Sequence, residues 1–226
     1  QLLEQGVDAN GKNNRGWTPL MEAADEANLS LVKLLVEKGA NVNAQSNFGW
    51  TALMEAVDEE AVSMVKYLIQ EGANINAATV SQFRDDNAKF EKFTIQKGWT
   101  PLFEAIDQSN PNIAEILIKN GANVNAEQIR TFDSFYKPRR QINNWTPLMD
   151  AVQQEQLSMV ELLVSNGANV NALIDGKESI LSMAKQTGNN AIITFLEAQG
   201  GTEQGSNELQ EKQLRNETDL KIQSPI

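Results

Sequence analysis

The side chains best suited to chemistry in this 226-residue chain are carboxylates and tryptophans that recur at matched positions. One acid stands at the same place in four similar phrases: Glu22, Glu55, Glu104 and Asp150. A second set of acids follows three or four residues later: Asp25, Glu26, Asp58, Glu59 and Asp107. Residues at this spacing share one face of a helix, so the acids form a row. The row is either a solvated helix face or a negative field that attracts a basic partner.

The four tryptophans of the chain share one position, five residues before the first acid: Trp17, Trp50, Trp99 and Trp145. Tryptophan supplies large contact area and dominates interface hot spots, which favours an aromatic strip that binds a partner. Alternatively each ring packs on its neighbour and shields a turn, and both roles can hold for one ring. Tryptophan also stacks on sugars, so carbohydrate binding or a carboxylate-based glycosidase remains a distant alternative.

Composition excludes several other classes of function. The chain has no His and no Cys, which removes the usual general base, the thiol nucleophile and the commonest metal ligand. The net charge of −11 argues against nucleic acid or an anionic membrane as the partner. No phosphate-binding loop, metal cluster or Ser–His arrangement occurs. We therefore expect neither an enzyme, nor a cofactor, nor a metal site.

The acids and tryptophans belong to a phrase that reads GWTPLMEAA at 16–24, GWTALMEA at 49–56, GWTPLFEA at 98–105 and NWTPLMDA at 144–151. Thr18 can cap a helix whose first turn takes Pro19. A more apolar second helix can end at Gly39, which starts a closing Gly-Ala-Asn phrase. One helix pair cannot bury its apolar faces alone, so stacked copies must supply the core.

The phrases at 16–24 and 49–56 lie 33 residues apart, and this period with Thr-Pro-Leu and Gly-Ala-Asn resembles the ankyrin repeat family. The resemblance implies an all-α solenoid of stacked helix pairs joined by β-turn fingers. It also implies a concave side where the four tryptophans and the exposed first-helix residues face a partner. One position departs from the family: its usual His is replaced by Met21, Met54, Phe103 and Met149. That His normally ties adjacent turns by hydrogen bonds, so packing must do this here.

We expect ankyrin repeats at 16–48, 49–77, 98–126 and 144–175. A partial repeat at 1–15 precedes them, and a C-terminal capping repeat at 176–200 and a polar tail at 201–226, expected to be disordered, follow. Two finger insertions, 78–97 and 127–143, lengthen the second and third intervals.

The insertions differ in composition from the rest of the chain. They carry net charges of +1 and +2 and six of its fourteen aromatic residues. Either the insertions pack on each other, or they present aromatic and basic side chains to a partner. The candidate contacts are Phe83, Arg84, Phe90, Phe132, Phe135, Tyr136, Arg139 and Arg140.

The sequence thus predicts a non-catalytic protein–protein interaction module, monomeric when free, that binds a basic protein through its groove and finger loops. One version is an inhibitor or self-protection factor of an enzyme, and the runner-up is an adaptor or secreted effector that recruits host proteins. A glycosylation sequon at Asn144 lies in a tight turn, which favours a cytoplasmic or bacterial exported setting over the eukaryotic secretory route.

Overall fold

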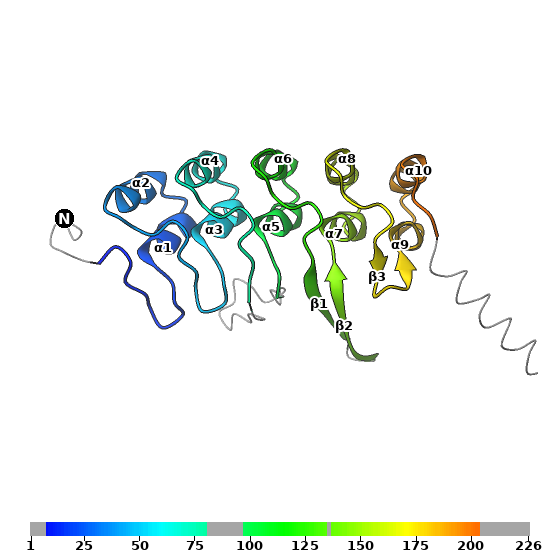
Figure 1. The fold of residues 1–226 in the computed structure, drawn as a ribbon, viewed down its shortest axis with the longest axis horizontal. Helices are drawn as coiled ribbons and strands as arrows, with labels where there is room; N and C mark the ends of the chain where they lie inside the picture. Colours follow the sequence, from blue (N-terminus) through cyan, green and yellow to red (C-terminus); the bar gives the residue numbers. More distant parts are fainter. Residues whose placement is uncertain (1–7, 81–96, 135–136, 204–226) are drawn as a thin grey trace, which may run out of the picture.

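The computed structural model describes residues 8–80, 97–134 and 137–203, and in these ranges the chain forms two layers of helices. The helices of each pair lie one above the other, and successive pairs follow along a single long axis (Figure 1). The first layer comprises α1 (Pro19–Asp25), α3 (Ala52–Asp58), α5 (Pro101–Asp107), α7 (Pro147–Gln153) and α9 (Ile180–Thr187). The second layer comprises α2 (Leu29–Glu37), α4 (Val62–Gln70), α6 (Pro111–Lys119), α8 (Leu157–Ser165) and α10 (Asn190–Ala198).

Four of the five first-layer helices described, α1, α3, α5 and α7, begin after a threonine, and three of these four start with a proline. Thr18, Thr51 and Thr146 accept hydrogen bonds from the backbone N–H groups three residues later, which are the donors that a helix start leaves unpaired. The second helix of the first pair ends before Gly39, whose φ of 86° lies in the left-handed region. The predicted start and stop signals are therefore confirmed here.

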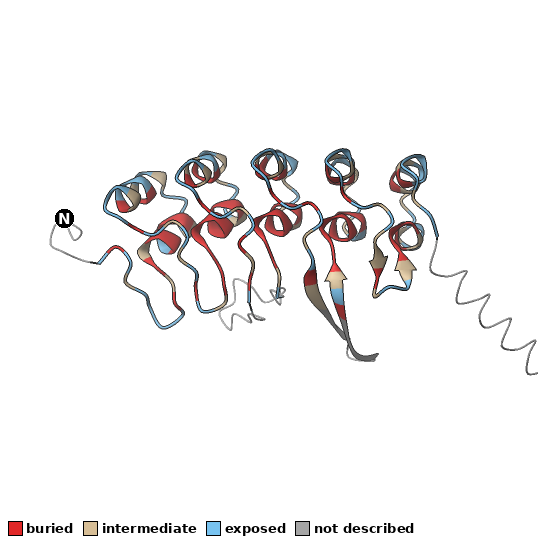
Figure 2. Ribbon diagram, in the orientation of Figure 1, coloured by how far each residue is buried: buried red, intermediate tan, exposed pale blue. Residues whose placement is uncertain are grey.

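The core lies between the two layers and between successive first-layer helices. α1 packs on α3, α3 on α5, α5 on α7, and α7 on α9. Figure 2 shows buried residues concentrated on the facing sides of the helices and exposed residues on the outer sides of the second layer. The four residues that replace the family's His are fully buried in this stack: Met21, Met54, Phe103 and Met149.

Strands are few and lie in the connections. β1 (Gln128–Ser134) and β2 (Lys137–Trp145) form an antiparallel hairpin that enters α7 directly. β3 (Leu173–Ile174) and β4 (Glu178–Ser179) form a shorter one before α9. The expected insertion at 127–143 thus falls on the long hairpin, whereas most of the insertion at 78–97 lies outside the described residues. The predicted all-α solenoid is confirmed.

Candidate protein-binding surface

The tryptophans stand where each finger turn meets its first-layer helix, and the structure buries most of them. Trp50, Trp99 and Trp145 are only 7%, 8% and 2% exposed, whereas Trp17 is half-buried. The threonine that follows each ring is buried as well. The rings therefore shield the turns, and the expected strip of open indole faces is absent from these three described positions.

Each ring lies in the same repeat as the acid five residues later, and we call these two side chains the indole–carboxylate pair. The Trp99 indole Nε1 donates to Glu104 Oε2 at 2.8 Å, and Trp145 Nε1 donates to Asp150 Oδ1 at 3.3 Å. Trp50 Nε1 is buried and has no hydrogen-bond partner within the described residues. In the first repeat Glu22 is exposed and accepts from Asn13 Nδ2 at 3.4 Å.

The paired acids of the second, third and fourth repeats are buried, so the alternative of a solvated helix face does not describe them. Glu55, Glu104 and Asp150 are 2%, 5% and 1% exposed. Burial raises the pKa of Glu55 well above its usual value, and Asp25, Asp58 and Glu104 raise it further. Burial, followed by the charge of Asp58, raises the pKa of Glu104 to about 8, although Gln108 and Trp99 donate hydrogen bonds to it.

The acids three or four residues further along form a surface that we call the acidic strip: Asp25, Glu26, Asp58, Glu59 and Asp107. Glu26 and Glu59 are exposed and the three aspartates are half-buried. Burial and the charges of Asp150 and Asp58 raise the pKa of Asp107 to about 6, whereas Arg130 lowers it. Gln108 links the second and third repeats, because its Nε2 donates to Asp58 Oδ1 at 2.5 Å and to Glu104 Oε1 at 3.1 Å.

The fourth indole–carboxylate pair has a further partner, Arg130 of β1. This residue was not among the predicted site residues. Its guanidinium lies over the Trp145 ring, 4.8 Å from the centroid, and forms an ion pair with Asp150 Oδ1. It lay within an insertion recognised as basic and aromatic. The composition therefore pointed to this segment, but no residue pattern predicts the hairpin register that directs the Arg130 side chain at α7.

Of the eight candidate contacts in the insertions, three lie in the described residues. The backbones of Phe132 and Arg140 pair across the hairpin, and Arg139 lies beside them in β2. Phe83, Arg84, Phe90, Phe135 and Tyr136 lie outside the described residues. Whether these residues pack or bind therefore stays a prediction.

Comparison with protein families connects this geometry to a known class. A family model described as "Ankyrin repeats (3 copies)" matches residues 1–79, and one described as "Ankyrin repeat" matches residues 97–128 and 143–175. The chain belongs to the ankyrin repeat family. Ankyrin repeats are protein–protein interaction modules and are typically non-catalytic. A comparison with curated proteins finds no significant match.

The ankyrin repeats of this chain are tied together by asparagines that were not among the predicted site residues. One asparagine per turn donates its Nδ2 to a glycine carbonyl of the next turn and accepts, through Oδ1, a backbone N–H two residues beyond that glycine. Asn43, for example, binds the Gly72 carbonyl at 2.9 Å and the Asn74 N–H at 2.6 Å. We call this series the asparagine ladder: Asn10, Asn43, Asn76, Asn125 and Asn171. Hydrogen bonds as well as packing therefore tie adjacent turns together.

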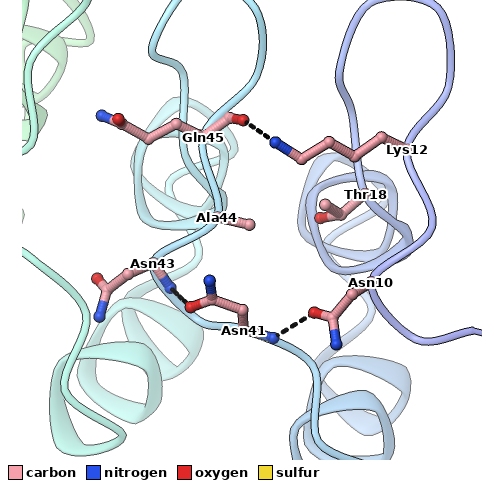
Figure 3. A pocket seen from close by; sticks show the side chains of 7 residues that line it. All are labelled: Asn10, Lys12, Thr18, Asn41, Asn43, Ala44 and Gln45. Atoms are coloured by element: carbon pink, nitrogen blue, oxygen red, sulfur yellow. Dashed lines mark hydrogen bonds between the residues drawn. The ribbon is translucent and has the colours of Figure 1, made fainter.

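A hollow of about 520 Å³ lies between the first two finger turns (Figure 3). Lys12 Nζ donates to the Gln45 carbonyl at 2.8 Å, and Asn41 N–H donates to Asn10 Oδ1 at 2.7 Å. The polar groups around it thus bind one another across the two turns, which makes it a gap spanned by turn-to-turn bonds.

Within residues 8–80, 97–134 and 137–203, no three His, Cys, Asp or Glu side chains form a group that could hold a metal ion. None of the helices described there has both the length and the apolar character that crossing a bilayer requires.

Proposed function

We propose that this ankyrin repeat protein binds a basic partner protein through the acidic strip and the adjacent finger turns. The observation that carries the proposal is the mutual repulsion of carboxylates from successive repeats. Burial raises the pKa of Asp107 to about 6, and the negative charges of Asp150 and Asp58 on the neighbouring repeats contribute to this increase. A cationic surface laid along the strip would relieve this repulsion, so the strip favours a basic partner over a neutral one.

We propose that the chain is non-catalytic and acts by occlusion, as an inhibitor or self-protection factor of a basic enzyme. A glycosidase needs two carboxylates that flank an open sugar site. Glu104 and Asp150 instead lie buried against indoles, each of which donates a hydrogen bond to one carboxylate oxygen. A tryptophan less than a tenth exposed also offers little face for a sugar to stack upon.

Affinity capture with a matched pair of charge variants tests the proposal. The purified wild-type chain serves as bait in an extract of the cells that produce it. The double variants Glu26→Gln/Glu59→Gln and Glu37→Gln/Glu161→Gln are used as bait in parallel. Both remove two exposed charges, the first from the acidic strip and the second from the outer helices α2 and α8. We expect one basic protein to be captured by the wild type and the control and to be lost by the strip variant.

Calorimetry with the purified partner then measures the electrostatic contribution. Exposed charges are screened by salt, so the Kd should rise at least about tenfold between 50 and 300 mM NaCl. It should also rise as the pH falls from 7.5 to 5.5, because Asp107 gains a proton near pH 6. A Kd that is indifferent to salt and to the strip variant would contradict the proposal. Inhibition of the partner's activity would separate the inhibitor from an adaptor or effector.

A further inference from the structure

The fourth indole–carboxylate pair differs from the others because it already holds a cation. Arg130 stacks its guanidinium on the Trp145 ring and forms an ion pair with Asp150 Oδ1. In the third repeat the corresponding acid, Glu104, instead accepts from the neutral amide of Gln108. The hairpin residue thus shows which chemical group this arrangement of ring and carboxylate accepts.

The acceptor at this site is only partly satisfied. Asp150 is 1% exposed, and its Oδ1 accepts from both Arg130 and Trp145. Its Oδ2 is buried and has no hydrogen-bond partner within the described residues. A buried carboxylate oxygen without a partner costs free energy, so the site favours a ligand that can reach both oxygens. Asp107 of the neighbouring repeat adds a second negative charge facing Asp150 and Arg130.

We infer that Trp145 and Asp150, with Asp107 beside them, form a guanidinium-binding site for an arginine side chain of a partner protein, and that Arg130 occupies this site in the free chain. The inference rests on the proposed function and names the partner's chemistry. A planar guanidinium stacks on an indole and forks onto two carboxylate oxygens, whereas an ammonium ion does neither as well.

Arg130 can be exchanged because it belongs to a connection and not to a helix layer. It lies on β1, in the hairpin between the third and fourth helix pairs, and its side chain is 26% exposed. An incoming arginine that binds both Asp150 oxygens would displace a residue that engages one. The hairpin therefore competes with the partner for the fourth repeat.

Titration of the full chain with N-acetyl-arginine amide tests the site without any knowledge of the partner. The indole N–H resonance of Trp145, assigned by its loss in Trp145→Phe, is followed at pH 8 in the wild type and in Arg130→Ala. We expect saturable shifts with a Kd of about 1–10 mM in Arg130→Ala and at least about tenfold weaker binding in the wild type. N-acetyl-lysine amide should bind Arg130→Ala at least about threefold more weakly than the arginine compound.

Two further variants keep the result decisive. Arg130→Met retains an apolar stem on the ring, and Arg130→Ala/Asp150→Asn removes the acceptor charge. The arginine compound should bind Arg130→Met and raise its Tm, and it should leave the double variant unchanged. Failure to bind or to stabilise either single variant would overturn the inference, as would equal binding of the lysine compound. Loss of the captured partner in the strip variant tests the proposed function separately, because that variant leaves this site intact.

Discussion

The first and fourth repeats carry the same indole–carboxylate pattern in two different environments. In the first, Trp17 is half-buried and Glu22 lies exposed on α1. In the fourth, Trp145 and Asp150 are at most 2% exposed, and Arg130 of the hairpin covers them. The repeat phrase places the two side chains at the same point of the helix pair in each case. Their burial and charge balance depend on the neighbouring turn and on the insertion, which the phrase does not contain.

The difference shows that one surface of a repeat protein can vary along its length while the backbone repeats. The pairs change from open to buried, whereas the asparagine ladder forms the same two hydrogen bonds at every step. Specificity for a partner can therefore reside in the pairs and the acidic strip, and the regularity of the stack in the ladder.

The largest expected effect comes from removing the cation that covers the fourth pair. Arg130→Ala leaves Asp150 buried and uncompensated, so the free energy of unfolding at pH 7 should fall by about 3–5 kcal/mol. Urea denaturation followed by circular dichroism measures this change. Adding Asp150→Asn removes the stranded charge and should restore most of the loss. Two losses that simply add would show that the ion pair has no role in the difference between the repeats.

Neutralising the third pair should stabilise the protein, and only at high pH. Glu104 has a pKa of about 8 in the folded chain against an ordinary 4.5, so between these values the folded state holds a proton that the unfolded state releases. Stability from this group is complete below pH 4.5 and declines as the pH rises towards 8. Glu104→Gln should therefore match the wild type at pH 5 and exceed it by on the order of 2–4 kcal/mol at pH 8.

Thermal and urea unfolding at both pH values check this prediction, with Glu22→Gln as the matched control. Glu22 is exposed, so the same chemical change in the first repeat should shift the unfolding free energy by less than about 0.5 kcal/mol at either pH. Equal responses of the two variants would remove the contrast between open and buried pairs.

Substitutions in the asparagine ladder should lower the free energy of unfolding by similar amounts in different repeats, unlike substitutions in the indole–carboxylate pairs. Asn43→Ala and Asn125→Ala each remove two hydrogen bonds to the next repeat, at exposed positions. We expect each substitution to cost about 1 kcal/mol, because exposed hydrogen bonds contribute modestly. Urea midpoints measure both. A loss several times larger at Asn125 than at Asn43 would mean that the ladder also varies along the chain.

Much of the fold could be predicted from the sequence because its signals are local. Thr18 caps its helix and Gly39 ends the next one through contacts within a few residues, and the 33-residue period then dictates stacking. The ladder was also readable: an asparagine two residues after each Gly-Ala-Asn recurs in every copy.

The site was less predictable because it depends on contacts between segments far apart in the sequence. Arg130 meets Asp150 only through the register of a hairpin with two irregular steps, which no residue pattern specifies. Glu55 is buried by its surroundings, although its own sequence context matches that of the exposed Glu22. A helical spacing of acids predicts a shared face but not whether water reaches it.

The central claim, that a repeated pattern becomes a buried and self-repelling row of acids in the middle of the chain, is tested most directly by NMR. Side-chain carboxyl ¹³C shifts of Glu104 and Asp107 are followed from pH 3 to pH 9 in the intact protein. The account predicts midpoints at about 8 for Glu104 and about 6 for Asp107. Midpoints at the ordinary values of 4.5 and 3.8 would show a solvated row and would contradict the account.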